Sequence, residues 1–387
     1  MSVVEEIYRT FIKEYQREPL LIRSPGRVNL IGEHTDYNEG FVLPAAVDRM
    51  IVIAAAKRED SLCRFYAHDL EDYFQCHLQD IHRSDKVWSN YILGVMDQFV
   101  DMDLPLRGVD CVFGGDIPIA AGMSSSAAIE CGFAFALDIL FELNLERMEI
   151  VQISQRAENE FVGVHCGIMD QFTNMFGKEN HTIRLDCRSL AYEYIPFDRE
   201  QLNIVLCDTG VRRPLTSSNY NRIREQCQEG VEILQRYDRK LRSLRDVSFE
   251  FLEQHRDALS PLIYERCRYV VDENMRVLSF CDALKRGDFD TAGGLMFDSH
   301  SGLRDEYGVS CAELDRLVDI ARDIEGVYGS RLMGAGFGGC TINLVREASV
   351  SHMIHLVKMR YREQTGTTPE VYVCQPAEGT SVIKRPE

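Results

Sequence analysis

The sequence lacks the run of about eighteen apolar residues that a membrane-spanning helix requires. Its first twenty residues carry charges throughout, unlike a secretion signal. It also lacks a Cys-x-x-Cys pair: its 13 cysteines lie at least a dozen residues apart, which argues against the common zinc and redox motifs. We therefore expect a cytoplasmic protein with reduced cysteines and no membrane segment.

Basic residues are scarce relative to acidic ones. The chain holds 43 lysines and arginines against 61 aspartates and glutamates, a net charge of −18. This balance disfavours a surface for nucleic acid or anionic membranes, so we expect neither as a partner. A polyanionic ligand would need positive charge at its binding site from arginines, helix N-termini or a metal ion. We expect a monomer without an obligate protein partner.

The chain length of 387 residues exceeds that of one ordinary core and predicts two domains. Alternating patterns predict strands at 50–58, 62–67 and 73–78, which indicates a mixed sheet in the first half. The segment 249–324 is largely helical by the same criterion. We place the boundary near Pro196, which gives an N-terminal domain 1–195 and a C-terminal domain 196–387. The predicted fold class is α+β, with mixed sheets packed against helices.

The stretch from Gly114 to Ala128 reads as a strand, a loop of small residues and a helix. Glycine and alanine allow close backbone approach, and the free N–H groups of a first helical turn favour anions. The hydroxyls of Ser124, Ser125 and Ser126 could bind phosphate oxygens or a magnesium ion. The common P-loop pattern ending in Gly-Lys-Ser/Thr is absent. The alternative is a tight strand-to-helix connection capped by Ser124 or Ser125.

An acidic turn follows a short apolar strand near the N-terminus. It places Glu33, His34 and Asp36 within four residues, after Arg27. All three side chains can hydrogen-bond hydroxyl groups, and carboxylates suit neutral polyols far better than phosphates. A sugar is therefore the natural ligand, and the alternative is a solvated turn.

Two further positions allow either a functional or a structural interpretation. Asp170 lies in an apolar frame in an expected first helical turn, where it could be a base in a dry pocket or a partner of the helix dipole. Trp88 is the only tryptophan and could stack on a purine base or anchor the core. Asn90 could cap the helix that follows Trp88.

The segment Gly334–Gly339 contains Gly-x-Gly-x-x-Gly, the spacing of a dinucleotide-binding turn. That turn must open a helix, whereas an alternating strand follows here, so we reject a dinucleotide site. A hairpin or a loop that covers the substrate is the better interpretation.

Several stretches together resemble the galactokinase family, within the superfamily of galactokinase, homoserine kinase, mevalonate kinase and phosphomevalonate kinase. Arg27–Tyr37 is similar to the galactokinase sugar signature, and Pro118–Ala128 to the ATP-phosphate motif of the superfamily. Met333–Cys340 resembles its glycine-rich third motif, and Cys166–Phe172 adds a further galactokinase match. The resemblance implies a two-domain sugar kinase with its active site in the interdomain cleft.

The resemblance also implies an activity: transfer of phosphate from ATP to the anomeric hydroxyl of α-D-galactose, the first committed step of galactose catabolism (Leloir pathway). Asp170 would face that hydroxyl, and Arg27 would hold Asp170 ionised and neutralise developing charge. Mg²⁺ would accompany ATP, held by Ser126 and Glu158. The implied sugar contacts are Arg27, Glu33, His34, Asp36, Gly167, Asp170 and Tyr220. The implied ATP contacts are Trp88, Gly122, Met123, Ser124, Ser125, Ser126, Ala127 and Arg212.

Two alternatives share the resemblance. A non-catalytic sensor that binds galactose and ATP would carry changes after the serine run, whereas Ala127-Ala128 is intact here. An N-acetylgalactosamine kinase would keep the chemistry and change the sugar, and Cys166–Ile168 favours galactose.

Overall fold

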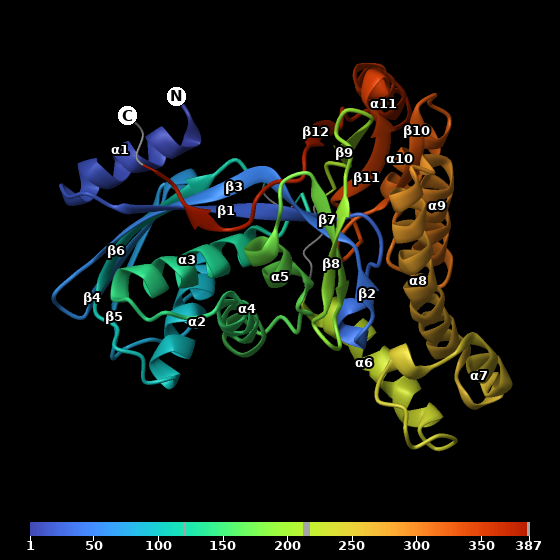
Figure 1. Ribbon diagram of the computed structural model, residues 1–387, viewed down its shortest axis with the longest axis horizontal. Helices are drawn as coiled ribbons and strands as arrows, with labels where there is room; N and C mark the ends of the chain where they lie inside the picture. The colour runs from blue at the N-terminus through green and yellow to red at the C-terminus, as the bar shows by residue number, and fades with distance from the viewer. Residues whose placement is uncertain (119–120, 212–216, 385–387) are drawn as a thin grey trace.

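The computed structural model describes residues 1–118, 121–211 and 217–384. Its largest sheet has six strands in the order β13-β1-β3-β6-β4-β5 (Figure 1). All neighbours are antiparallel except β4 and β6, which run parallel. The strands are β1 (Leu20–Asn29), β3 (Pro44–Lys57), β4 (Leu62–Ala67), β5 (Asp72–His77), β6 (Val109–Gly115) and β13 (Ser381–Val382).

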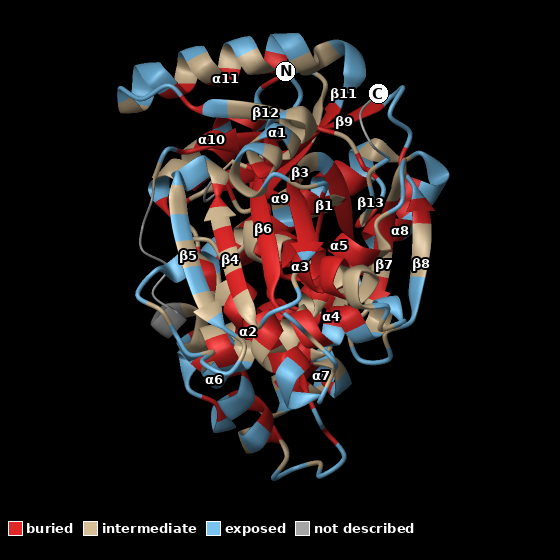
Figure 2. Cartoon of the chain, turned by 90° about the vertical axis from the view of Figure 1, so that its left-hand side faces the viewer, coloured by how far each residue is buried: buried red, intermediate tan, exposed pale blue. Residues whose placement is uncertain are grey.

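Helices cover both faces of this sheet. The helix α1 packs on one face through Ile7 and Phe11, and α2 to α5 lie on the other (Figure 1). The central strands β1, β3 and β6 are therefore buried from both sides (Figure 2). The helices are α1 (Val3–Tyr15), α2 (Val87–Asp101), α3 (Ser125–Phe141), α4 (Arg147–Arg156) and α5 (Met169–Phe176).

Two local predictions differ from this arrangement. The expectation that Asn90 caps α2 is wrong: the helix begins at Val87, and Asn90 instead exchanges two hydrogen bonds with the backbone of Ser84. The amide thus fixes the loop before the helix. The helix α4 ends at Arg156 and continues as a π-helical turn (Ala157–Val162) that contains Glu158. Such turns are frequent at functional sites.

The second half of the chain forms an antiparallel sheet in the order β10-β11-β9-β12, beside a small sheet β2-β7-β8. The larger sheet consists of β9 (Leu202–Asp208), β10 (Val327–Leu332), β11 (Cys340–Arg346) and β12 (Glu370–Cys374), and the smaller of β2 (Phe41–Val42), β7 (His181–Asp186) and β8 (Tyr192–Pro196). The associated helices are α6 (Ser217–Leu234), α7 (Phe249–Gln254), α8 (Pro261–Arg286), α9 (Phe289–Asp305), α10 (Ala312–Arg322) and α11 (Val350–Thr365).

The domain boundary at Pro196 stays a prediction. The strand β8 ends at that residue, and β9 begins the second large sheet. The strand β13, however, returns from the end of the chain to pair with β1 in the first sheet. Within the described residues, no helix combines the length and apolar character that crossing a membrane would take.

Candidate active site

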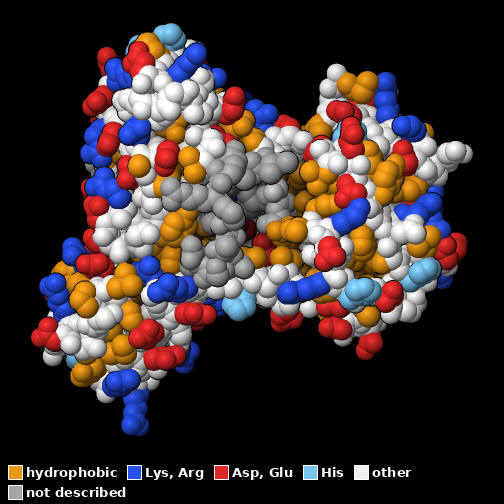
Figure 3. Space-filling view, turned by 180° about the vertical axis from the view of Figure 1, so that it is seen from behind, with side chains coloured by type: hydrophobic (Ala, Val, Ile, Leu, Met, Phe, Trp, Pro, Cys, Tyr) orange, Lys and Arg blue, Asp and Glu red, His pale blue; other side chains and the backbone are white. Residues whose placement is uncertain are grey.

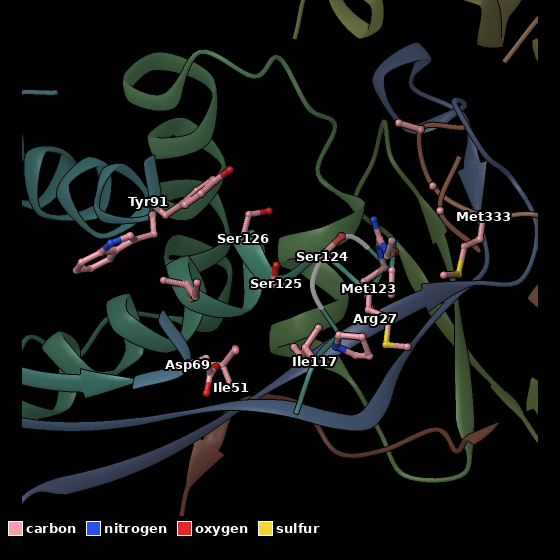
Figure 4. A pocket seen from close by; sticks show the side chains of 18 of the residues that line it. Arg27, Ile51, Asp69, Tyr91, Ile117, Met123, Ser124, Ser125, Ser126 and Met333 are labelled. Carbon is pink, nitrogen blue, oxygen red and sulfur yellow. The ribbon is translucent and has the colours of Figure 1, made fainter. Parts of the chain in front are cut away.

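A cavity of about 540 Å³ lies where the two halves of the chain meet, and the space-filling view shows the molecule hollowed between two lobes (Figure 3). The serine loop forms one wall, and the hairpin loop Gly334–Gly339 forms another. Figure 4 shows the three serines at the centre of the cavity, with Tyr91 on one side and Met333 on the other. The remaining wall is mostly apolar, from Ile51, Leu70, Trp88, Phe113 and Ile117.

A second cavity of about 310 Å³ adjoins the first. Both are lined by Arg27, Tyr91, Ser126, Gly334 and Ala335. Its own walls carry the polar residues that the sequence singles out: Glu33, His34, Asp36, Glu158, Asp170 and Tyr220. Segments far apart in the sequence thus form one continuous site with a polar compartment and a largely apolar one.

Arg27 and Asp170 meet at the junction of the two cavities. The guanidinium Nε donates to Asp170 Oδ1 at 2.7 Å and Nη2 donates to Oδ2 at 2.6 Å, while Nη1 donates to the Gly122 carbonyl at 2.5 Å. Burial would lower the pKa of Arg27, but the Asp170 carboxylate outweighs this effect and raises it. Arg27 is therefore a fixed positive charge whose planar fork orients Asp170.

The structure rejects a simple capping role for Ser124. The residue stands at the N-cap of α3 with a left-handed backbone (φ 53°), and its side chain makes no capping hydrogen bond. Its hydroxyl instead donates to Asp170. The strand-to-helix connection thus contributes directly to the acidic centre of the site, and Asp170 lies in the first turn of α5 as predicted.

Glu158 and Ser126 present neighbouring oxygen donors between the compartments. Burial and the nearby Asp170 raise the pKa of Glu158 to about 7, against hydrogen bonds from Cys166, Ser126 and Gln171. Mg²⁺ prefers such oxygen ligands and commonly completes its shell with phosphate and water. Among the described residues no cluster of three His, Cys, Asp or Glu side chains could enclose a metal alone. The donors fit a cation that is shared with a bound phosphate.

The acidic turn is anchored to the third motif. The Glu33 carboxylate accepts hydrogen bonds at Oε1 from the Gly334 amide (2.8 Å) and from Arg331 (3.2 Å). Arg331 is fully buried and also bonds the carbonyls of Asn29 and Leu30, in β1 and just after it. The alternative of a solvated turn is wrong, because Glu33 and His34 are both buried.

Gly167 lies directly against Asp36. A Cβ added at this glycine would stand 2.0 Å from Asp36 Oδ2, so any other residue would displace the carboxylate. We expect Gly167→Ala to weaken sugar binding about tenfold, as for a lost hydrogen bond to a charged group, with little change in the melting temperature. Calorimetric titration and thermal melting check this. A Gly294→Ala variant, where added atoms meet nothing within 4 Å, is the matched control.

Ionisation of Asp36 lowers the stability of the folded protein, so its effect on stability depends on pH. Burial and the Asp170 charge raise its pKa from 3.8 to about 7. Between these values the folded protein holds a proton that the unfolded chain has lost, so the stability contribution is complete below pH 4 and disappears as the pH rises through 7. Asp36→Asn removes this dependence.

We therefore expect the stability of Asp36→Asn relative to the unsubstituted protein to increase by about 4 kcal/mol between pH 4 and pH 8, with no sugar present. Thermal melts of both proteins at the two pH values measure the difference. The variant should also lose sugar affinity. A stability difference that does not change with pH would contradict the assignment.

The ATP positions implied by the sequence fall into three groups. Gly122, Met123 and the serines line the larger cavity, whereas Ala127 is buried behind it. Trp88 agrees both with stacking on a base and with anchoring the core. It lines the cavity, and it also packs against Phe113 and donates from Nε1 to Asp72 (2.9 Å). Arg212 lies outside the described residues.

Comparisons with known proteins agree with this geometry. The family model described as the galactokinase galactose-binding signature matches residues 9–57, and the models for the GHMP kinase N-terminal and C-terminal domains match residues 90–178 and 281–357. The galactokinase of Roseiflexus sp. (strain RS-1) is 43% identical over 98% of this chain and 97% of its own length. The chain belongs to the galactokinase family. A Thermotoga maritima galactokinase is 40% identical over 94% of the chain and 99% of its own.

Solved structures of similar proteins have the same fold. The galactokinase of Lactococcus lactis, crystallised in complex with galactose, has a TM-score of 0.94 at 35% identity and covers 99% of this chain and 100% of its own. The mevalonate kinase of Methanococcus jannaschii has a TM-score of 0.64 at 18% identity, over 93% of this chain and 99% of its own, which extends the likeness in fold to the superfamily. The predicted galactokinase-type α+β fold is confirmed.

Sequence reasoning missed two polar residues of this galactokinase-family site. Glu130 is fully buried in α3, four residues after Ser126 and hence on the same helix face. Gln171 Nε2 lies 3.3 Å from Glu130 Oε2 and 2.7 Å from Glu158 Oε2, so the amide links the two acids. Burial and Glu158 raise the pKa of Glu130 well above its usual range, which keeps it protonated. The sequence signal that could have indicated Glu130 is a single glutamate among the apolar residues of a helix.

Proposed function

We propose that the protein transfers the γ-phosphoryl group of MgATP to the anomeric hydroxyl of α-D-galactose, giving galactose 1-phosphate and ADP. The observation that carries this proposal is the bidentate Arg27–Asp170 pair at the junction of a polar cavity and a largely apolar one. The 310 Å³ cavity suits a sugar, and the 540 Å³ cavity suits a nucleotide. The acceptor hydroxyl and the γ-phosphate would meet beside Asp170.

The residues act in distinct ways in the proposed reaction. Asp170 accepts the proton of the anomeric hydroxyl or orients that hydroxyl for attack, and Arg27 offsets the charge on Asp170 and at the reacting oxygen. Both contributions suit a loose phosphoryl-transfer transition state, in which alignment and charge neutralisation dominate. Glu33, His34, Asp36, Gly167 and Tyr220 hold the remaining hydroxyls of the sugar.

The larger cavity receives the nucleotide in this proposal. The first turn of α3 and the hydroxyls of Ser124–Ser126 face its phosphates, with Gly122 and Met123 beside them. Trp88 and the apolar wall contact the base. Ser126 and Glu158 would hold Mg²⁺, which would supply positive charge to neutralise the phosphates.

The deciding experiment measures ADP release from purified protein with MgATP and galactose, N-acetylgalactosamine, glucose or mevalonate in parallel. We expect rapid release with galactose alone. Release only with N-acetylgalactosamine would keep the mechanism and reassign the sugar. Measurable binding of galactose and ATP without release would indicate a sensor.

We further propose that the enzyme is a cytoplasmic monomer, on the basis of the cysteine spacing and the acidic composition. Light scattering at working concentrations tests the assembly state, and fractionation of cells that produce the protein tests its location.

A further inference from the structure

One oxygen of the Glu158 carboxyl group is occupied by contacts within the protein. Gln171 Nε2 donates to Glu158 Oε2 at 2.7 Å, and Cys166 Sγ lies 3.3 Å from the same oxygen. Ser126, the other oxygen donor between the compartments, also hydrogen-bonds this carboxyl group. Gln171 and Cys166 thus both contact Oε2, and Oε1 is left for a ligand of the cavity that Glu158 lines.

The main chain at Glu158 is fixed as well. The residue lies in the π-helical turn Ala157–Val162, and its carbonyl accepts hydrogen bonds from the amides of Gly163 (2.9 Å) and Val164 (3.1 Å). The helix α2 packs against this turn. Because the main chain is held here, the direction of the carboxyl group depends on its side-chain partners.

Gln171 is well placed to hold that direction. It follows Asp170 in the first turn of α5, and it is fully buried. Its Nε2 also lies 3.3 Å from Glu130 Oε2, so each of the two amide hydrogens has a carboxyl oxygen within reach. A carboxylate that binds a cation is ionised and only accepts hydrogen bonds, which requires the NH₂ group, and not the amide oxygen, to face Glu158. The amide is therefore held from two sides.

We propose that Gln171 is a positioning residue for the cation that accompanies the nucleotide: it holds Glu158 through Oε2, so that Oε1 serves as a metal ligand beside Ser126. This inference rests on the proposed function, because the cation is the one expected with ATP. Gln171 itself lines neither of the two cavities. It acts only through Glu158.

A fixed carboxylate matters for a magnesium site. Mg²⁺ is small and demands near-ideal octahedral geometry, so a ligand that rotates freely binds it poorly. Among the described residues no three His, Cys, Asp or Glu side chains group around a metal position, so the direction of each protein oxygen carries more weight. Hydrogen bonds that orient a metal ligand commonly contribute about ten- to a hundredfold to metal affinity.

Gln171→Met tests the inference, because methionine keeps the length and approximate volume of the side chain and removes the amide. We expect the affinity for Mn²⁺, measured with ADP and without sugar, to fall about tenfold or more. Mn²⁺ takes the same oxygen ligands as Mg²⁺, and the electron paramagnetic resonance signal of free Mn²⁺ measures its binding directly. The affinities for galactose and for ADP without metal should stay within about twofold.

A second variant covers the case in which Gln171→Met does not fold. Gln171→Asn keeps an amide in the buried space, but the side chain is one methylene shorter, so its NH₂ group withdraws from Glu158 Oε2. It should weaken Mn²⁺ binding in the same direction. An Mn²⁺ affinity within about twofold of the unsubstituted protein, in a folded variant of either kind, would overturn the inference.

The matched control is Gln98→Met. Gln98 is another buried glutamine, and its Nε2 donates at 3.2 Å to Oε2 of Glu160, in the same π-helical turn. Neither residue lines either of the two cavities. This variant should leave the Mn²⁺ affinity unchanged. An equal loss in Gln98→Met and Gln171→Met would mean that loosening of the turn, and not the direction of Glu158, causes the effect, which would overturn the inference.

The Mn²⁺ titration depends neither on turnover nor on the identity of the sugar. If galactose is not phosphorylated but Gln171→Met alone weakens Mn²⁺ binding, the proposed function fails and the positioning role stands. If the unsubstituted protein binds no Mn²⁺ in the presence of ADP, the inference fails even where galactose is phosphorylated.

Discussion

Replacing Asp170 by Asn is expected to lower kcat with galactose about 1000-fold, within the range for loss of a positioned general base or charged acceptor. The amide has nearly the same shape but cannot accept a proton, and it cannot accept both Arg27 hydrogen bonds at 2.7 and 2.6 Å. The variant also leaves Arg27 with less compensation at a site where the arginine is only 7% exposed. Steady-state kinetics with galactose and MgATP measure the effect.

Two controls separate chemistry from folding in this experiment. Circular dichroism and ATP titration should show that Asp170→Asn is folded and still binds nucleotide, because the Gly122 carbonyl continues to hold Arg27. Asp198→Asn, on an exposed turn, should leave turnover unchanged. Turnover of Asp170→Asn within tenfold of the unsubstituted enzyme would remove Asp170 from the catalytic role.

The second large effect is expected from Arg27→Lys, which keeps the charge and changes its shape. An ammonium group cannot make the two parallel bonds to Asp170 together with the bond to Gly122, so the carboxylate loses its fixed orientation. We expect kcat to fall about 100-fold, comparable to the loss of one preorganised donor, and Arg27→Ala to fall further. Kinetics at saturating substrates check both variants.

An exposed ion pair supplies the control for Arg27. Arg49 and Asp116 lie 3.2 Å apart with about a third of each side chain exposed. Arg49→Lys should leave turnover unchanged, because exposed ion pairs contribute little to stability. If the turnover of Arg27→Lys stays within a few-fold of the unsubstituted enzyme, a positive charge at this position is enough for catalysis. The planar shape of the guanidinium would then not affect turnover.

The parts of the site that could be predicted from sequence are those carried by contiguous motifs. The turn around Glu33, the serine loop and the helical turn at Asp170 each place their functional groups within a few residues of one another. Local pattern and chemistry therefore suffice to mark them as candidates, and the family resemblance supplies the roles expected of them. The hairpin after Met333 was likewise recognisable because a strand follows its glycines.

The remaining features depend on contacts between distant segments. Arg331 reaches Glu33 across roughly three hundred positions, and Tyr307 reaches Tyr37 across nearly as many. No periodic pattern of apolar residues in the sequence indicates either contact. The π-helical turn at Glu158 and the early start of α2 were also not predicted from the sequence, because tertiary packing overrides helix signals at the ends of elements. The position of Asn90 illustrates this, since an amide suited to capping instead fixes a loop.

The pairing of β13 with β1 has a mechanical consequence. Because the chain builds the first sheet, moves to the second and then returns, the two halves are joined by more than one covalent crossing (Figure 1). Thr380, just before β13, also bonds Ser24 and Asn174, which ties this return to β1 and α5. Halves joined in this way cannot swing apart about a single linker. Access to the cavities must come from small rotations and loop displacements, so the two reactants meet in a frame that keeps its alignment from one turnover to the next.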